Sequence, residues 1–351
     1  MSNYTPITLI GFGVAGQLLL SHILDILPAY KIAIVDPDFI GGDLARDYRS
    51  INTNTTIQQK VDAFMSISNG KWVNTATALK TRGDLNGCLS IASLAEDIRQ
   101  TGHKMAASCN QIYDEVLNAM WDTTSKLWTL TFKSKRPTHS TSVICMCSGI
   151  LPRQEDCGIP IIPLRIALDP SALAKTVSPG QTVTIIGSAH SATLIIKHLN
   201  SLSDVRSICI YRGSEPFRYA RDGYYDGIKQ ESAVIADSIM KGEYSRLSLV
   251  HISDIHALSN ALRKSNWIIQ ATGFDSRMIK FMDSLKAELQ PNWDPATGLA
   301  TELPQVQAFG ACVPNITILD GKKFPDISVG SFIDQLVTRW PLLEKTIEQL
   351  N

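Results

Sequence analysis

The feature that most constrains the fold is a glycine turn between an apolar strand and an apolar helix near the start of the chain. The stretch ITLIGFGVAGQLLLSHIL covers residues 7–24 and places Gly11, Gly13 and Gly16 directly after an unbroken apolar run. Such a run is typical of a strand buried on both faces of a parallel sheet. A second apolar run, residues 32–35, ends in Asp36, twenty residues beyond Gly16. The pattern predicts a strand–helix–strand unit of the kind that binds dinucleotides.

Each of these residues has a physical task in such a site. Gly11 permits the tight turn, Gly13 lets the backbone approach a pyrophosphate, and Gly16 lets the helix pack closely on the strand. Asp36 accepts hydrogen bonds from a ribose hydroxyl, and the helix N-terminus supplies free N–H groups for the phosphates. The alternative is a parallel-sheet turn without a ligand. The strand, helix and acid together favour binding.

The composition excludes several classes of function. The 351 residues leave room for two domains, and the 44% of hydrophobic residues can fill both cores. Thirty-three basic and thirty-three acidic residues cancel, so neither a nucleic acid nor a membrane surface is expected as a partner. The first predicted strand follows within six residues of the start, so no signal or transit peptide is expected. Seven cysteines without framework spacing favour a reducing compartment, and we therefore expect a soluble, cytoplasmic protein.

A second glycine turn occurs in altered form further along the chain. Residues 182–186 are expected to form another buried strand, and GSAHSA follows as Gly187 to Ala192, before a helix to residue 199 and a strand over residues 207–211. Ala189 stands where the second glycine is expected, and its methyl group crowds the closest approach of a phosphate. The pattern predicts a second strand–helix–strand unit and leaves open whether this unit binds a nucleotide.

The residues after this second unit favour NADPH over NADH. No acid stands at the end of the strand, where a carboxylate would bind the ribose diol, and Arg212 and Arg218 follow instead. Guanidinium groups pair well with a 2′-phosphate. The alternative is that both arginines form a solvated surface patch.

Further apolar segments complete the two predicted sheets. Residues 142–149 and 267–273 are expected to be strands that end in small residues and in Gly149 or Gly273, where the last strand of each unit should lie. Residues 111–117 and 127–132 are expected to form a hairpin around a polar turn.

These motifs resemble those of the two-dinucleotide-domain flavoproteins. The matching pieces are Gly11 to Gly16 with Asp36, the Cys147-Ser148-Gly149 closure, Gly187 to Ala192, and Ala271-Thr272-Gly273. The chain looks closest to the flavin-dependent N-hydroxylating and Baeyer–Villiger monooxygenases, with thioredoxin reductases as more distant relatives. Arg212 and Arg218 are similar to the NADPH-reading arginines of thioredoxin reductases, with one extra residue between them. The resemblance implies an α/β fold with two Rossmann-like three-layer dinucleotide-binding domains, the second inserted in the first.

The resemblance also implies a division of the chain and a set of cofactor contacts. Residues 1–155 and 275–351 would bind FAD, and residues 156–274 would bind NAD(P)H. Residues 39–53 would wrap the flavin, although residues 52–56 are equally well explained as a polar loop. The N-terminus of a helix over residues 332–340 would stabilise negative charge on the reduced flavin ring. The expected cofactor-binding residues are Gly11, Gly13, Gly16, Asp36, Gly42, Asn52, Gly149, Gly187, Ser188, Ser191, Arg212, Arg218, Gly273, Gly310 and Ser331.

Two departures from the flavoprotein pattern are visible. Many relatives carry an aspartate after the late glycine, and its carboxylate holds the ribityl chain of the flavin. This chain has Ala311 after Gly310, so the contact must come from elsewhere or be missing. The tyrosine-rich residues 218–244 are a candidate for a lid or substrate wall, or an ordinary surface excursion.

No catalytic residue can be named from the sequence. There is no Cys-x-x-Cys motif, and the side chains of Cys145 and Cys147 would lie about 7 Å apart on one face of a strand, which disfavours dithiol chemistry. His190 could touch a nicotinamide, but a solvated loop position is favoured. No histidine pair has metal-ligand spacing, so no metal is predicted. This absence is consistent with flavin chemistry, in which the cofactor performs the reaction and the protein binds and orients it.

The leading hypothesis is an FAD-dependent, NADPH-using oxidoreductase, preferably a monooxygenase that acts on a small molecule. One alternative is a flavoprotein-like binding or regulatory module with little or no catalysis. A second is an FAD-dependent reductase of the thioredoxin reductase type without its Cys-x-x-Cys motif, and a third is a dehydrogenase with NAD at the first turn. The sequence is compatible with a homo-oligomer and does not identify the substrate.

Overall fold

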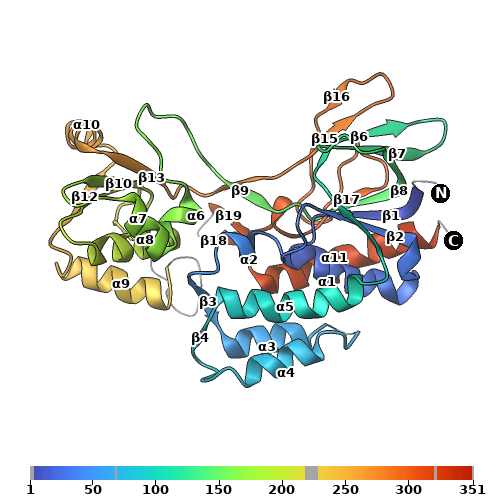
Figure 1. The fold of residues 1–351 in the computed structure, drawn as a ribbon, viewed down its shortest axis with the longest axis horizontal. Helices are drawn as coiled ribbons and strands as arrows, with labels where there is room; N and C mark the ends of the chain where they lie inside the picture. The colour runs from blue at the N-terminus through green and yellow to red at the C-terminus, as the bar shows by residue number, and fades with distance from the viewer. Residues whose placement is uncertain (1–3, 68, 218–227, 320–321, 350–351) are drawn as a thin grey trace. The chain divides into compact units, whose positions relative to one another are not determined.

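The computed structural model describes residues 4–67, 69–217, 228–319 and 322–349. Its backbone divides into two compact units, and each is described by itself. The first unit comprises residues 1–49, 56–150 and 276–351, and the second comprises residues 50–55 and 151–275. The second unit therefore interrupts the first, and both are α/β in composition (Figure 1).

A nine-stranded sheet forms the centre of the first unit. In sheet order the strands are β16 (Glu288–Leu289), β15 (Lys280–Met282), β6 (Val116–Asp122), β7 (Leu127–Phe132), β8 (His139–Met146), β1 (Tyr4–Ile10), β2 (Ile32–Asp36) and β5 (Asn110–Tyr113), and β17 (Val306–Ala308) also pairs with β8. The first strand, β1, is parallel to β2, which follows the first glycine turn, and to β8, the predicted closing strand of the unit. Both pairings agree with the prediction from the sequence.

The predicted hairpin is wrong in its first strand. Residues 110–113 form β5, a parallel neighbour of β2, and the hairpin pairs β6 with β7 in antiparallel fashion. The turn that separates β5 from β6 falls at Asp114, whose carboxylate accepts hydrogen bonds from the N–H groups of Glu115 and Ser134. The sequence QIYDEVL over residues 111–117 does not show which strand each half pairs with, because both halves are strand-like.

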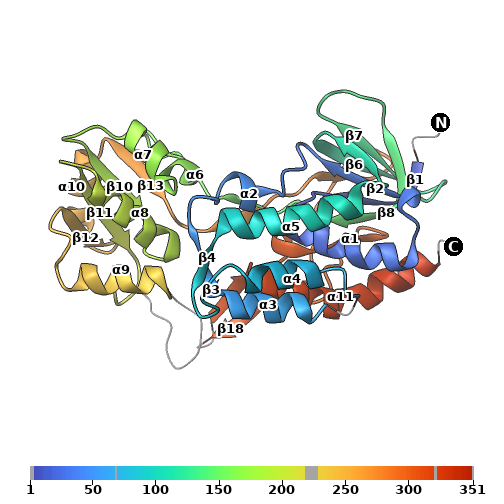
Figure 2. The same cartoon turned by 60° about the horizontal axis from the view of Figure 1, so that its bottom comes forward.

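The alternating side chains of β1 and β2 fill two cores, one on each face of the sheet. Ile7, Leu9, Ile32 and Ile34 belong to one core, whereas Ile10, Ala33 and Val35 belong to the other. Helices α1 (Val14–Ile26), α5 (Ile91–Ala106) and α11 (Val329–Glu348) cover the first face. Figure 2 shows α3 (Ile57–Met65) and α4 (Val73–Lys80) packed beyond α5 and α11. Burial of both faces agrees with the unbroken apolar runs of the sequence.

The terminal helix is longer than predicted and begins earlier, at Val329 instead of Phe332. Its N-cap is Ser328, whose side-chain oxygen accepts a hydrogen bond from the N–H of Ser331 at 3.1 Å. The remaining elements of the chain outside the two main sheets are η1 (Ala29–Lys31), α2 (Asp43–Arg46), β3 (Asn52–Thr56), β4 (Cys88–Ser90), η2 (Gly310–Cys312), β18 (Asn315–Leu319), β19 (Lys322–Asp326), and β9 (Ile150–Pro152), which pairs with β14 (Phe274–Ser276).

A parallel four-stranded sheet forms the second unit. Its strands are, in order, β12 (Leu247–His251), β11 (Arg206–Tyr211), β10 (Thr182–Ile186) and β13 (Trp267–Gln270). Figure 1 shows α10 (Ile255–Lys264) on one face, and α7 (Pro170–Thr176), α8 (His190–Ser201) and α9 (Glu231–Met240) on the other, with α6 (Leu164–Ala167) near the edge of the sheet. The predicted three-layer arrangement is thus present in this unit. Within the proposed lid, residues 231–240 form α9, and residues 218–227 lie outside the described residues.

Among the helices of the described residues, none has the length and apolar character that crossing a membrane requires.

Candidate functional site

The first glycine turn has the geometry that its sequence predicts. Gly11 adopts a φ of +97°, and a Cβ atom there would lie 2.4 Å from the carbonyl oxygen of Cys147. A Cβ atom on Gly16 would lie 2.3 Å from the carbonyl oxygen of Gly11. Both distances are far below van der Waals contact, so only glycine fits at either position. The turn is tied to the sheet by a hydrogen bond of 2.8 Å from the N–H of Gly11 to the carbonyl of Val35.

Helix α1 starts directly after Gly13, which is its N-cap and has no side chain to cap it. The first N–H groups of the helix are therefore available to an anion. A Cβ atom on Gly42 would lie 2.8 Å from the Cα of Gly13, so the backbone at residue 42 comes very close to the turn. Gly41 and Gly42 have φ angles of +102° and +72°, which other residues rarely adopt. Two backbone segments without side chains thus converge at the start of α1, where the free N–H groups of the helix can bind a pyrophosphate.

Asp36 stands at the end of β2 and is only 5% exposed. Its Oδ2 accepts a hydrogen bond from the N–H of Phe12 at 2.8 Å, and its Oδ1 accepts from the N–H groups of Asp38 at 3.1 Å and Phe39 at 2.8 Å. A carboxylate offers about four acceptor positions, so Oδ2 can accept one more hydrogen bond. The side chain therefore fixes the glycine turn to the loop after β2 and still fits the role of a ribose acceptor.

The late glycine predicted to close the site lies against the same helix start. Gly310 has a φ of +78°, and a Cβ atom there would lie 2.4 Å from the Cβ of Ala15. Gln335 of α11 holds it in place, because its Oε1 accepts from the N–H of Gly310 at 2.5 Å and its Nε2 donates to the carbonyls of Gly310 and Val313, each at 3.3 Å. Gln335 is fully buried and was not predicted. The sequence shows only a polar residue on an amphipathic helix, and its long-range partner is invisible there.

Arg339 is a second buried side chain on α11 that the sequence analysis missed. It is 0% exposed and donates to the carbonyls of Ala308 at 2.7 Å, Val313 at 2.9 Å and Pro295 at 2.5 Å, and to Oδ1 of Asn315 at 3.2 Å. Burial lowers the pKa of this guanidinium to about 10. Since these acceptors flank Gly310, Arg339 fixes the chain on both sides of the late glycine turn.

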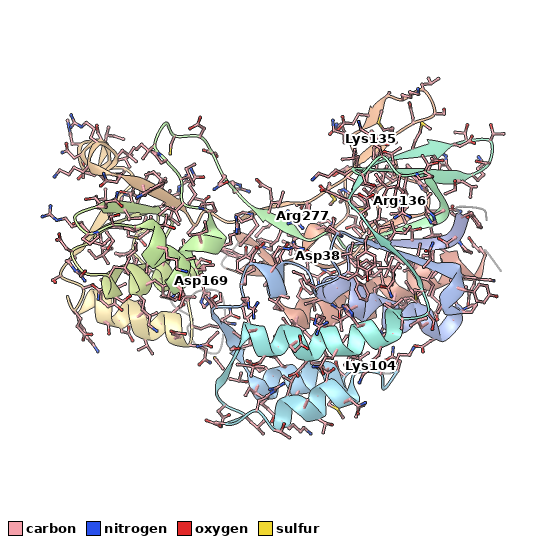
Figure 3. The ribbon with its side chains drawn as sticks, in the orientation of Figure 1. Asp38, Lys104, Lys135, Arg136, Asp169 and Arg277 are labelled. Atoms are coloured by element: carbon pink, nitrogen blue, oxygen red, sulfur yellow. The ribbon has the colours of Figure 1, made fainter. Side chains whose placement is uncertain are left out.

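A charged cluster lies at the rim of the site, where the loop after β2 approaches the end of β8. Oδ1 of Asp43 accepts from Arg46 at 3.1 Å and from Arg277 at 3.2 Å. The N–H of Arg277 donates to the carbonyl of Gly149 at 3.0 Å, and Oγ of Ser148 donates to the carbonyl of Arg277. Burial raises the pKa of Asp43, although the charge of Arg277 opposes the shift. Figure 3 labels Arg277 and also Asp38, which pairs with Arg46 at 2.5 Å.

The second glycine turn repeats the backbone hydrogen bonds of the first. The N–H of Gly187 donates to the carbonyl of Ile210 at 2.9 Å, and the N–H of Ala271 donates to the carbonyl of Ile186 at 2.8 Å. The equivalent bonds of the first turn join Gly11 to Val35 and Cys147 to Ile10, each at 2.8 Å. Gly187 has a φ of +114°, and a Cβ atom there would lie 2.3 Å from the carbonyl oxygen of Ala271. The second unit therefore contains the same turn.

The two turns differ at the positions that would contact a ligand. Ala189 is the N-cap of α8 and is exposed, so its methyl group lies where Gly13 has none. Ile186 pairs with Ile210, so Tyr211 occupies the position that Asp36 has in the first unit. Its ring packs against His251 at 5.1 Å, and Arg212 follows as an exposed residue. Arg218 lies outside the described residues.

His190 is more constrained than the sequence analysis expected. It is the first residue of α8, and its Nδ1 forms a hydrogen bond of 2.7 Å with Oγ of Ser232, which is 0% exposed. Burial lowers the pKa of His190, which favours the neutral ring. The predicted solvated loop position is therefore wrong for this side chain, because α9 packs against it.

The remaining predicted site residues fall into both units. Gly149 and Ser331 belong to the first, and the hydroxyl of Ser331 donates to the carbonyl of Asp326 at 3.1 Å. Ser188, Ser191 and Gly273 belong to the second, where the two serines are half-buried and Gly273 has a φ of +102°. Asn52 also belongs to the second unit, and its Nδ2 donates to Oε2 of Glu231 at 3.1 Å.

All seven cysteines lie in the described residues and are free thiols. Cys145, Cys147 and Cys312 are buried, and burial raises the pKa of each, so these thiols stay protonated at neutral pH. Within the described ranges, no group of three or more His, Cys, Asp or Glu side chains could hold a metal ion.

A cavity of about 380 Å³ lies between the loop after β2 and α5, within the first unit. It is lined by Asp38, Phe39, Ile40, Ala45, Arg49, Ala92, Ala95, Glu96, Arg99 and His103. His103 forms a hydrogen bond of 2.5 Å with the carbonyl of Phe39, whose ring packs against those of Phe12 and Tyr113. The cavity therefore sits on the outer side of the loop that Asp36 anchors.

No family model matches the chain. The monooxygenase AgnR1 of Paecilomyces divaricatus is 25% identical, over 76% of this chain and 77% of that protein. Among solved structures, the ornithine N-hydroxylase of Kutzneria sp. 744, with reduced FAD, NADP+ and L-ornithine, has a TM-score of 0.63 at 13% identity and covers 99% of both chains. The thioredoxin reductase of Lactococcus lactis has a TM-score of 0.55 at 11% identity and covers 98% of this chain and 99% of its own. The chain thus has the fold of the two-dinucleotide-domain flavoproteins, as its motifs predicted.

Proposed function

We propose that this protein is an FAD-dependent oxidoreductase that uses NADPH and acts as a monooxygenase on a small molecule. The observation that carries the proposal is the pair of glycine turns with the same backbone hydrogen bonds, each opening a helix that has no side-chain cap. The similarity to a monooxygenase across three quarters of the chain favours oxygen insertion over disulfide reduction. The raised pKa values of the buried thiols of Cys145, Cys147 and Cys312 support the same choice, because a disulfide reductase requires a reactive thiolate.

In this proposal the segments 1–155 and 275–351 bind FAD. The pyrophosphate lies at the start of α1, beside Gly13 and Gly42, whose backbones lie so close together that a Cβ atom on Gly42 would collide with Gly13. A ribose hydroxyl donates to Oδ2 of Asp36, which has one acceptor position left. Gly11 and Gly16 shape the turn, and Gly149, Gly310 and Ser331 line the part of the site that faces the flavin. Asn52 was expected there as well, and its assignment rests on the sequence alone.

Residues 156–274 bind NADPH in the same proposal. The pyrophosphate lies at the start of α8, next to Gly187, Ser188 and Ser191, and Gly273 leaves room at the end of β13. Because Tyr211 replaces the acid, the end of β11 lacks the carboxylate that would repel a 2′-phosphate in that position. Arg212 and Arg218 then supply the positive charge that such a phosphate requires.

The cofactor supplies the redox chemistry, and the chain binds, orients and shields it. The N–H groups at the start of α1 hold the phosphates, which fixes the position of the attached ring system. Buried, protonated thiols at Cys147 and Cys312 leave no competing nucleophile beside the site. The absence of a side chain at Gly310 lets this segment pack directly against Ala15 in the first turn of α1.

The proposal is tested by the colour and the reduction of the purified protein. We expect a yellow protein with a flavin absorbance band that NADPH bleaches under anaerobic conditions faster than NADH does. Oxygen should restore the band and yield an oxygenated product when a substrate is present. A colourless protein that cannot be reconstituted with FAD would overturn the proposal.

A binding or regulatory module without catalysis is the second candidate. The exposed methyl group of Ala189 at the second turn and the missing carboxylate at Ala311 favour it. Bound FAD that neither nicotinamide cofactor reduces would support this module. A reductase of the thioredoxin reductase type would require two cysteine thiols that come together when the substrate binds. Reduction of a chromogenic disulfide in the presence of NADPH would identify such a reductase.

A further inference from the structure

Asp43 lies in the proposed FAD site, and the described hydrogen bonds to its carboxylate use only one of the two oxygen atoms. Both arginines next to Asp43 donate to Oδ1, and Oδ2 has no hydrogen-bond partner among the described residues. The side chain as a whole is 18% exposed. The acceptor positions of Oδ2 are therefore available to a donor group of a ligand.

Oδ2 faces a space that only glycine leaves open. A Cβ atom on Gly149 would lie 3.3 Å from Oδ2, closer than ordinary van der Waals contact, and Gly149 has a φ of +77°. Gly42 directly precedes Asp43 and lies against Gly13 at the start of α1. The carboxylate of Asp43 is therefore placed between the start of α1, where the pyrophosphate is proposed to bind, and Gly149, which follows β8.

This is also the place where the chain lacks the carboxylate that many of the flavoproteins it resembles carry after the late glycine. Because Met146 pairs with Ala308, Gly149 and Gly310 leave neighbouring parallel strands at the same edge of the sheet. Residue 311, after the late glycine, is alanine. Asp43 reaches the same edge from the loop after β2, and the N–H of Arg277 fixes its neighbour Gly149 through the carbonyl oxygen at 3.0 Å.

We infer that Oδ2 of Asp43 accepts a hydrogen bond from a hydroxyl group of the ribityl chain of FAD, an inference that rests on the proposed function. The chemistry of the atom selects this partner. A carboxylate oxygen accepts from a hydroxyl donor, whereas a phosphate offers only acceptors and would be repelled. Arg277 is a positioning residue, because it holds Oδ1 and so directs Oδ2 towards Gly149.

The test separates the ribityl chain from the rest of the cofactor by comparing FAD with ADP, which lacks the ribityl chain and the flavin. Dissociation constants for both are measured on the apoprotein by calorimetry. Asp43→Ala is expected to weaken FAD binding about ten- to a hundredfold, as the loss of a charge-assisted hydrogen bond would. ADP binding is expected to change by less than about threefold, because its phosphates and ribose contact other residues.

Asp47→Asn is the matched control, because it removes a negative charge four residues away without touching Gly149. It should leave both dissociation constants within about twofold of the unmodified protein. Asp43→Asn, which keeps an acceptor oxygen of similar shape, should recover part of the lost FAD affinity.

An unchanged FAD affinity in Asp43→Ala would overturn the inference while leaving the proposed function intact. Equal weakening of FAD and ADP would do the same, since Asp43 would then support the whole site. An unmodified protein that binds ADP but no FAD would overturn the proposed function and the inference with it. Retained ADP binding in the variant also demonstrates that it is folded.

Discussion

Asp36 and Tyr211 occupy equivalent positions in the two units. Asp36 directly follows Val35, the last residue of β2 that pairs with β1, and Tyr211 directly follows Ile210, the last residue of β11 that pairs with β10. In the first unit the acid closes the turn by accepting from the N–H of Phe12. In the second unit an aromatic ring packs on His251 instead. The same strand–turn–helix backbone thus carries an acid in the first unit and an aromatic residue in the second. This difference determines which ligand each unit can accept at the end of that strand.

Replacing Asp36 should destabilise the protein even without a cofactor. Asp36→Ala leaves the buried N–H groups of Phe12 and Phe39 without an acceptor, and each unpaired buried group costs about 1–3 kcal/mol. We expect the free energy of unfolding of the apoprotein to fall by about 2–4 kcal/mol in urea titrations. Asp38→Ala removes a partly exposed ion pair and should cost less than about 1 kcal/mol. Equal losses in the two variants would contradict the anchoring role.

Gly42→Ala should empty the flavin site. A methyl group there would lie 2.8 Å from the Cα of Gly13, so the two segments at the start of α1 must separate. Gly158→Ala is the control, because Gly158 has nearly the same φ, +70°, with no described atom within 4 Å of the added Cβ. Both variants place an alanine at a positive φ, which is strained, and Gly42 has in addition a ψ of −162°, a combination that is essentially restricted to glycine. Only Gly42→Ala is expected to lose flavin absorbance after purification, and full retention there would refute the placement of the pyrophosphate.

Arg212 should determine the choice of nicotinamide cofactor. A charge-assisted hydrogen bond contributes about 1.5–3 kcal/mol, so Arg212→Ala should raise KM for NADPH by about ten- to a hundredfold. KM for NADH should change far less, because NADH lacks the phosphate. Arg206→Ala, at the other end of β11, serves as the control. A natural preference for NADH would show that the arginines are surface charges.

Arg339→Leu should destabilise the first unit strongly. The substitution leaves buried carbonyl oxygens at Ala308 and Val313 without a donor, and each unpaired buried acceptor costs about 1–3 kcal/mol, so we expect the free energy of unfolding to fall by about 2–5 kcal/mol. Arg339→Lys should restore little, because an ammonium group cannot match the planar fork. Thermal unfolding followed by circular dichroism measures both, with the exposed Arg263→Leu on α10 as a comparison. A small loss in Arg339→Leu would mean that water replaces the guanidinium.

Stability should depend on pH through His139. Burial, together with the charge of Arg136, lowers the pKa of this ring to about 4 in the folded protein. The unfolded chain has a pKa of about 6.5, so between these values the unfolded state binds more protons and stability falls as the pH is lowered. Urea midpoints from pH 7 to pH 4 should show this decline, and His139→Gln should flatten it. An unchanged slope in the variant would assign the effect to other groups.

Local patterns in the sequence were sufficient for the elements that one segment specifies by itself. β10 has the predicted bounds and β2 extends one residue further than its apolar run, to Asp36, because a continuous apolar run and an adjoining turn define each of them. The division between β5 and β6 was missed because it depends on which strand each half pairs with, and pairing is not local. Whether the named glycines hold a cofactor remains a prediction.

The side chains that fix the site were hidden for a related reason. Gln335 and Arg339 are polar residues on an amphipathic helix, where sequence reasoning places them on the solvent side. Their partners lie about thirty residues away in the chain, at Gly310 and Ala308. Asp43 was not predicted because the sequence pattern of this loop singles out only the two glycines before it. In all three cases the function of the side chain follows from a backbone that the sequence does not display.

The position of Arg339 has a consequence for how the protein is made. The ribosome delivers β1 and the first glycine turn early, yet the chain around Gly310 is held by a side chain that emerges after the whole second unit. Domains generally fold as they leave the ribosome. The second unit, which is nearly continuous in the chain, can therefore fold while the first still waits with an unfinished sheet. The first unit must keep its apolar strands from aggregating until residue 339 has been added.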